Sequence, residues 1–386
     1  MTKSPSNIPY GRQHIDSKDI EAVIHVLNSP ALTQGDTINK FENALARYCG
    51  TNYAVAVSSG TAALHVANLA MGVREGDIVI TSPLSFVASS NSIIYCGGKP
   101  HFIDIDPTTN NISLSQLEAV LKKRKVKGIM PVHFAGYPCD LKTIHELAKK
   151  NGCFVIEDAC HALGAKYSGE KIGSCAYSDM AVFSFHPVKS ITTGEGGAIL
   201  TNSEFLYNKL CKLRNHSMIY PHQESTWYYD IKELGFNYRI TDIQCALGIM
   251  QLKKIEYLLA KRREYKNIYF ELLKKFDEIL LPLNDDENYM SSWHLFCIKL
   301  KLEKIATIKE ALVNYLRSNG IGVQVHYKPI HLHSYYQSKF QYHIGSFPNA
   351  ENVYHEILSL PLYPSLTKKM IHSVVNTLRT ALEVFS

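Results

Sequence analysis

Residues 178–201 read SDMAVFSFHPVKSITTGEGGAILT, and this stretch decides the fold. An apolar run ends at Ser184, and Lys189 follows in an irregular turn held by Pro187, before a glycine-rich return to a second apolar run. A lysine at a strand end is badly placed for a surface charge. It is well placed to bond a carbonyl cofactor, because desolvation or a neighbouring cation lowers the pKa of a lysine and makes its amine nucleophilic.

Asp158 closes another apolar run, in the segment CFVIEDACHALGA at 153–165. An acid at the carboxyl end of a parallel strand lies where open α/β sheets bind their ligands. On its own, this aspartate is equally well interpreted as the N-cap of a helix.

A turn of small residues follows a third apolar run, in YAVAVSSGTAALHVANLAM at 53–71. Ser58, Ser59, Gly60 and Thr61 fall at the start of a predicted helix, where free N–H groups and the helix dipole favour an anion such as phosphate. By itself this turn is more readily interpreted as an ordinary helix cap. The chain has no Walker A loop and no G-x-G-x-x-G motif. Lysine, aspartate and turn together match the groups that bind pyridoxal 5'-phosphate.

Apolar runs alternate with amphipathic segments and predict an α/β fold. We expect strands at 53–57, 77–81, 101–104, 128–133, 153–157, 180–185 and 198–201, and helices that include 61–71, 141–150 and 204–214. Apolar strands separated by helices are typical of a parallel sheet that is covered on both faces. The pattern therefore predicts a large domain with a mostly parallel seven-stranded sheet.

The pattern changes towards the C-terminus. Long helices are expected at 241–254 and 257–276, then strands at 294–300 and 322–326, and helices near 304–318 and 366–385. This favours a smaller C-terminal α+β domain. We divide the chain into 1–280, for an N-terminal arm and the large domain, and 281–386, for the small domain. The first forty residues are expected to pack on the small domain or on a partner.

The composition excludes several classes of protein. The 386 residues are 46% hydrophobic and 20% charged, with a net charge of +6, and the densest basic stretch, KKRKVK at 122–127, is interpreted as a solvated helix end rather than a nucleic-acid site. Nine scattered cysteines fit neither a zinc site nor a disulfide framework, so we expect reduced thiols, no metal and a cytoplasmic location. Without a long apolar segment or a secretory signal, no membrane association is expected.

Three motifs carry a family resemblance: EDACHALGA (157–165), FSFHPVKSITTGEGGAI (183–199) and LGFNYRITDIQCALGIMQLKK (234–254). They resemble the fold-type I sugar aminotransferases of the DegT/DnrJ/EryC1/StrS family, and the resemblance covers nearly the whole chain. The segments IPYGRQ, LTQG, TSPLSFVASSN and HALGA are similar to the branch that aminates C4 in pseudaminic acid biosynthesis. This resemblance implies transfer of an amino group from L-glutamate to a UDP-linked 4-keto-6-deoxy-N-acetylhexosamine, with pyridoxal 5'-phosphate as cofactor and two half-reactions through one site.

The resemblance also implies roles for residues around the cofactor. Lys189 bonds the cofactor aldehyde and moves the proton between cofactor and substrate carbons. Asp158 pairs with the pyridinium nitrogen, Phe86 covers one face of the ring, and His161 lies near the phenolic oxygen. The groups that would hold the phosphate are Gly60, Thr61, Ser184 and, from the neighbouring subunit, Asn237. This last assignment implies a homodimer with active sites shared across the interface.

For the nucleotide sugar, the resemblance implies contacts from two separate parts of the chain: Tyr10, Ala31, Leu32 and Thr33, and Gln324, His326, Tyr327 and Lys328. Weaker candidates for charge contacts are Arg214, His216 and Arg239. One residue departs from the family pattern, because relatives often carry glycine where this chain has Ser217.

Three other functions are compared with the same residues. One alternative is a C4 or C3 aminotransferase that acts on a different keto-deoxy nucleotide sugar, for example on the legionaminic acid or bacillosamine route. A dehydratase branch of the family carries histidine at the position of Lys189. A non-enzymatic protein on the same fold would be expected to lack Lys189 or Asp158, and both are present.

Overall fold

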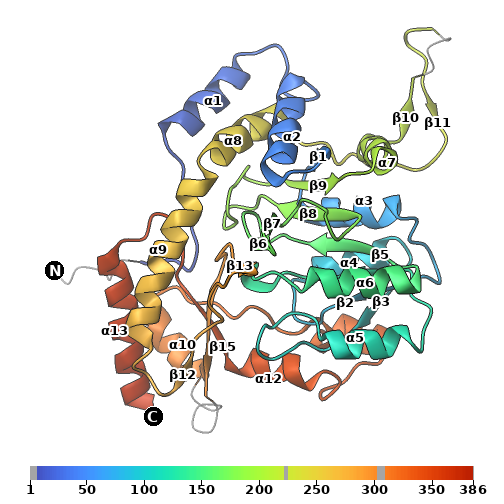
Figure 1. The fold of residues 1–386 in the computed structure, drawn as a ribbon. Coiled ribbons are helices and arrows are strands. Elements are labelled where there is room, and N and C mark those ends of the chain that lie inside the picture. The colour runs from blue at the N-terminus through green and yellow to red at the C-terminus, as the bar shows by residue number, and fades with distance from the viewer. Residues whose placement is uncertain (1–6, 221–224, 302–308, 386) are drawn as a thin grey trace.

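The computed structural model describes residues 7–220, 225–301 and 309–385 (Figure 1). A seven-stranded sheet lies at its centre. In spatial order its strands are β1 (Tyr53–Val57), β9 (Gly197–Thr201), β8 (Met180–Ser184), β5 (Phe154–Asp158), β4 (Gly128–Met130), β2 (Ile78–Thr81) and β3 (Lys99–Phe102).

The sheet is mostly parallel, which confirms the predicted fold class. The neighbours from β8 to β3 are parallel, and β9 alone among the seven runs antiparallel to both its neighbours, β1 and β8. The return after Lys189 is too short for a crossover helix, so the chain comes back in the opposite direction.

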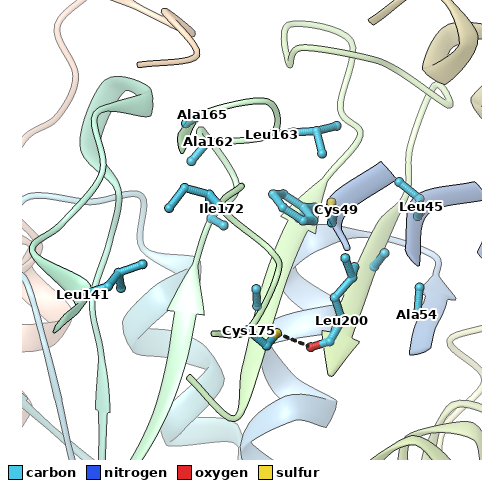
Figure 2. Close-up of a cluster of buried hydrophobic side chains, with 14 of the residues drawn as sticks. Leu45, Cys49, Ala54, Leu141, Ala162, Leu163, Ala165, Ile172, Cys175 and Leu200 are labelled. Atoms are coloured by element: carbon cyan, nitrogen blue, oxygen red, sulfur yellow. Dashed lines mark hydrogen bonds between the residues drawn. The ribbon is translucent and has the colours of Figure 1, made fainter. Parts of the chain in front are cut away.

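Helices cover both faces of the sheet (Figure 1). One face, which carries Ala54 and Leu200, packs against α2 (Asp36–Cys49), α5 (Leu114–Leu121), α6 (Leu141–Asn151) and α8 (Asp242–Lys253). Figure 2 shows part of this layer, where the Cys175 thiol donates to the carbonyl oxygen of Leu200 at 3.3 Å. The opposite face, which carries Val55 and Val182, packs against α3 (Gly60–Ala70), α4 (Ala88–Tyr95) and α7 (Glu204–Arg214). Successive residues of a strand therefore enter two different cores.

A second core forms around the three-stranded sheet β12 (Ile279–Leu280), β14 (Phe296–Leu300) and β15 (Ile357–Leu360). Helices α10 (Lys309–Ser318) and α13 (Lys368–Phe385) pack on it, together with the second half of α9 (Ile255–Leu273), which spans both parts of the molecule in Figure 1. Ile8 also belongs to this core. We keep 1–280 and 281–386 as a proposed division, with Ile8 and α9 contributing across it.

The remaining elements are short, apart from the N-terminal helix. They are α1 (Ser17–Leu27), η1 (Phe134–Gly136), β6 (Lys166–Tyr167), β7 (Glu170–Lys171), β10 (Met218–Ile219), β11 (Asp230–Ile231), β13 (Tyr289–Met290), η2 (Ile330–Leu332), α11 (Ser334–Phe340) and α12 (Pro348–Glu356). Among the described residues, no helix is long and apolar enough to cross a membrane.

One sequence-based expectation is wrong, and a second holds only in part. Residues 322–326 do not form a strand, because the segment pairs with β15 only at Gln324 and Ser359 and then turns away. The first forty residues do not pack only on the small domain or on a partner, since α1 and α2 both lie against α8. Buried Asp19 on α1 accepts hydrogen bonds from Gln251 at 2.9 Å and from Lys254 at 2.5 Å. The expected helix at 304–318 begins in the described chain at Lys309, and residues 304–308 lie outside the described residues.

Candidate active site

A cavity of about 550 Å³ opens where the ends of β5 and β8 meet the N-terminus of α3. The strand register places Asp158 beside Val182, two residues before the end of β8. Gly197 pairs both with Ser184, at the end of β8, and with Val57, at the end of β1. The carboxyl ends of three strands thus converge at one edge of the sheet, as ligand sites in α/β folds do.

The start of α3 forms one end of this cavity. Ser59 caps the helix, and its hydroxyl oxygen accepts from the N–H of Ala62 at 3.1 Å. A Cβ at Gly60 would lie 2.8 Å from the Cβ of Ser184, and a Cβ at Gly197 would lie 2.5 Å from the carbonyl oxygen of Ser59. Glycine at these positions therefore lets the helix start lie against both β8 and β9. A helix N-terminus that faces a cavity favours a phosphate.

Lys189 enters the cavity from the turn after β8. Two hydrogen bonds hold this turn. The backbone N–H of Lys189 donates to the carbonyl oxygen of His186 at 2.9 Å, and the hydroxyl of Thr192 donates to the carbonyl oxygen of Phe185 at 2.9 Å. Burial lowers the pKa of the Lys189 ammonium, while the negative charges that Cys160 and Asp158 can carry oppose this shift. A lowered pKa raises the fraction of neutral, nucleophilic amine.

Asp158 also lines the cavity and is buried. Its carboxylate accepts from the hydroxyl of Ser89 at 2.6 Å and from the N–H of Cys160 at 3.3 Å. Neither partner is a cation, so the carboxylate retains the capacity to accept from a protonated ring nitrogen.

A group of neutral rings forms the wall from the C-terminal part of the chain. The hydroxyl of Tyr327 lies 3.1 Å from Nε2 of His161, and the rings of His161 and His294 are 4.4 Å apart. Burial lowers the pKa of both histidines well below the usual value, and the charge of Lys189 lowers it further. A tyrosine hydroxyl can donate to Nε2 or accept from it, so this contact is compatible with either tautomer of neutral His161. Nδ1 is buried and has no partner among the described residues, which leaves one ring nitrogen for a hydrogen bond to a ligand.

His326 and Tyr10 complete this wall. Nδ1 of His326 lies 2.8 Å from the hydroxyl oxygen of Ser359, and its ring centroid is 5.5 Å from that of Tyr10. Burial, with a further contribution from Lys189, lowers the pKa of His326 to about 4.

The structure places most of the predicted site residues around this one cavity. Those that line it are Tyr10, Gly60, Thr61, Phe86, Asp158, His161, Ser184, Lys189, Gln324, His326 and Tyr327. Five others do not line it: Ala31, Leu32, Thr33, Asn237 and Lys328. Thr33 instead pairs with Thr241 at the start of α8, and Asn237 pairs with Asn215.

Arg214 is a structural residue rather than a charge contact for the substrate. Its guanidinium forms an ion pair with buried Glu42 and donates to the carbonyl oxygen of Ala56 at 2.7 Å. Arg239 likewise donates to the side chain of Asn215 at 2.6 Å. These contacts fix β1 and the loop beside it.

Ser217, the departure from the family pattern, has a φ of 55° and is buried. This left-handed conformation favours glycine, in agreement with the residue that relatives often carry.

Several lining residues were missed from the sequence: Ser85, Ser89, Cys160, His186, Val188, Glu195, His294 and Val325. Ser85 and Ser89 belong to the segment TSPLSFVASSN, which carries part of the family resemblance and is the sequence signal for both; Ser85 precedes α4, and Ser89 lies on it. His294 is the first residue of the strand predicted at 294–300 and carries no such signal.

The residues present fit pyridoxal phosphate. A helix N-terminus can hold the phosphate, buried Asp158 can pair with the ring nitrogen, the amine of Lys189 can reach an aldehyde, and Nδ1 of His161 offers one more hydrogen-bonding group. The fold and this cavity together define a lysine-dependent enzyme of the pyridoxal phosphate class.

The chain belongs to the DegT/DnrJ/EryC1/StrS aminotransferase family, whose profile matches residues 13–379. A Campylobacter jejuni protein named UDP-4-amino-4,6-dideoxy-N-acetyl-beta-L-altrosamine transaminase is 41% identical over 97% of this chain and 98% of its own. Helicobacter pylori PseC, described as an aminotransferase of pseudoaminic acid biosynthesis, superposes with a TM-score of 0.92 at 34% identity, over 98% of this chain and 100% of PseC. The putative sugar aminotransferase Spr1654 from Streptococcus pneumoniae, solved in its PLP form, has a TM-score of 0.91 at 27% identity, over 98% and 100% of the chains. This chain is a pyridoxal phosphate-dependent sugar aminotransferase.

The low pKa of His326 predicts a loss of stability in acid. An unfolded histidine binds a proton below about pH 6.5, whereas folded His326 resists it down to about pH 4. Between pH 7 and pH 5 this residue therefore lowers the free energy of unfolding by roughly 2 kcal/mol. Urea denaturation at the two pH values should show a smaller difference for His326→Gln than for the unmodified chain. The matched variant His372→Gln, at an exposed histidine, should keep the full difference. If His326→Gln showed the same difference in the free energy of unfolding between pH 7 and pH 5 as the unmodified chain, the low pKa of His326 would be contradicted.

Proposed function

We propose that this enzyme transfers an amino group from L-glutamate to C4 of a UDP-linked 4-keto-6-deoxy-N-acetylhexosamine. The product would be UDP-4-amino-4,6-dideoxy-N-acetyl-β-L-altrosamine, a precursor in pseudaminic acid biosynthesis. The observation that carries the proposal is the placement of Lys189 and Asp158 on one cavity beside the start of α3. The name of the Campylobacter jejuni relative supports the choice of sugar.

Several residues of the cavity have a task in this reaction. Pyridoxal phosphate, when bound, supplies an electron sink for the carbon that loses its proton. Nζ of Lys189 takes the proton from the α-carbon of glutamate and later delivers a proton to C4 of the sugar. Asp158 keeps the ring nitrogen protonated, and the helix start at Gly60 holds the phosphate. The neutral rings of His161 and Tyr327 enclose the reacting atoms and exclude water.

The sugar is tested by product analysis. The substrate that would give the proposed product is UDP-2-acetamido-2,6-dideoxy-β-L-arabino-hex-4-ulose. The enzyme is incubated with L-glutamate and either this L-arabino sugar or its C5 epimer, the D-xylo sugar, and the products are identified by NMR. The expected result is C4 amination of the L-arabino sugar, with parallel initial-rate lines because the two half-reactions share one site. Exclusive amination of the D-xylo sugar, or of C3, would contradict the proposed substrate.

Lys189→Ala is the matched control for this assay. Loss of acid–base catalysis alone costs ~10²–10⁴-fold, and the variant also loses the bond to the cofactor, so turnover should disappear. Circular dichroism should show an unchanged fold. Substantial turnover by this variant would contradict the role of Lys189.

We also propose a homodimer with shared active sites. A hairpin that contains β10 and β11 projects from the body of the molecule (Figure 1) and exposes Tyr220 by 59%, Trp227 by 78% and Leu234 by 87%. Large apolar side chains gathered on a projecting element favour contact with another chain. Asn237 follows this hairpin and does not line the cavity of its own chain, in keeping with a role in the site of a second copy.

Sharing of sites is tested by mixing two inactive variants, Lys189→Ala and Asn237→Ala. A mixed dimer has one site with both residues intact if Asn237 acts across the interface, so random re-assembly should restore about a quarter of full activity. If Asn237 acts within its own chain, no mixed dimer has an intact site, and the mixture stays inactive. Light scattering on the unmodified enzyme supplies the oligomeric state, and an active monomer would refute the proposal.

A further inference from the structure

Two buried serines connect the start of α4 to Asp158. The hydroxyl oxygens of Ser85 and Ser89 are 2.7 Å apart, and that of Ser89 lies 2.6 Å from Oδ2 of Asp158. Ser85 is 4% exposed and Ser89 is 1% exposed, and both line the cavity. Neither residue has a role in the function proposed so far.

The direction of the hydrogen bonds follows from the acceptor at the end of the chain. An ionised carboxylate can only accept, so the hydroxyl of Ser89 must donate its single hydrogen to Asp158. The oxygen of Ser89 is then free to accept from the hydroxyl of Ser85. Ser89 also lies 3.3 Å from the carbonyl oxygen of Phe86, a much longer contact that cannot use the same hydrogen. The chain therefore runs from Ser85 to Ser89 to Asp158.

A donor aimed at a carboxylate stabilises its charged form. Such charge-assisted bonds are stronger than neutral ones, and a bond of this kind within a buried site is screened little by water. Two donors in series polarise one another, so Ser85 strengthens the donation from Ser89. A proton shared between Asp158 and a ring nitrogen would therefore be displaced towards the nitrogen.

We propose that Ser89 is a positioning residue, supported by Ser85, which keeps Asp158 ionised so that the shared proton stays on the ring nitrogen of the cofactor. This inference rests on the proposed pairing of Asp158 with that nitrogen. The segment SFVASSN would then have a second role, in addition to covering one face of the cofactor ring with Phe86.

The direct readout is the ¹⁵N chemical shift of ring-labelled pyridoxal phosphate in the holoenzyme. This shift reports whether the ring nitrogen is protonated, and it requires no turnover. The unmodified enzyme and Asp158→Asn supply the two reference values. If those two values coincide, the pairing itself is wrong, and both the proposed role of Asp158 and this inference fall.

With distinct references, Ser89→Ala should move the shift from the unmodified value towards that of Asp158→Asn. Ser85→Ala should move it in the same direction by less, and Ser89→Thr, which keeps the hydroxyl, should restore it. The kcat of Ser89→Ala should fall by roughly 10-fold or more, the scale of a hydrogen bond to a charged group, with the KM for the sugar unchanged.

The matched control is Ser90→Ala. Ser90 is fully buried on the same helix but does not line the cavity. This variant should keep the chemical shift and kcat of the unmodified enzyme. The proposal would be overturned if Ser89→Ala had the same ¹⁵N chemical shift as the unmodified enzyme. It would also be overturned if Ser90→Ala displaced the shift as far as Ser89→Ala does. If Ser89→Ala fails to fold, Ser89→Cys, with a weaker donor of similar size, takes its place under the same criteria.

Discussion

The withdrawal of Lys189 from water beside the carboxylate of Asp158 is the constraint on which the rest of the structure depends. A lysine in solvent stays protonated, whereas burial lowers the pKa of Lys189 and makes its amine available. Burial of a charged lysine in an apolar core without a partner would cost much of the protein's stability. The sheet instead supplies a cavity at its carboxyl edge, where Asp158 and the start of α3 meet the turn after β8.

Close packing makes that cavity possible. Gly60 allows the start of α3 to lie against Ser184 at the end of β8, and Gly197 allows β9 to lie against Ser59, because a Cβ at either position would clash. The reversed strand β9 follows from the same short return after Lys189. Residues from the C-terminal part of the chain then close the site, and Tyr327 fixes the orientation of His161 through one hydrogen bond. The cavity is thus built from several distant segments, each held by its own core.

The fold class and the cofactor could be predicted from the sequence because the patterns that indicate them lie within short, continuous segments. Apolar runs end at Asp158 and Ser184, and glycine-rich or small-residue turns follow them. Contacts between distant segments could not be predicted in this way. The bond between Ser89 and Asp158 depends on the order of strands in the sheet, and the ring pair of His161 and His294 depends on how two cores meet. Residues 322–326 alternate like a strand, yet tertiary contacts of Gln324 and Tyr327 override that pattern.

The visible absorption spectrum of the purified enzyme with pyridoxal phosphate tests the central claim most directly. A cofactor bonded to Lys189 should give a yellow band, L-glutamate should bleach it, and the matching 4-keto sugar should restore it. An enzyme that stays colourless with added pyridoxal phosphate, or a colour indifferent to both substrates, would contradict an aminotransferase site built on Lys189 and Asp158.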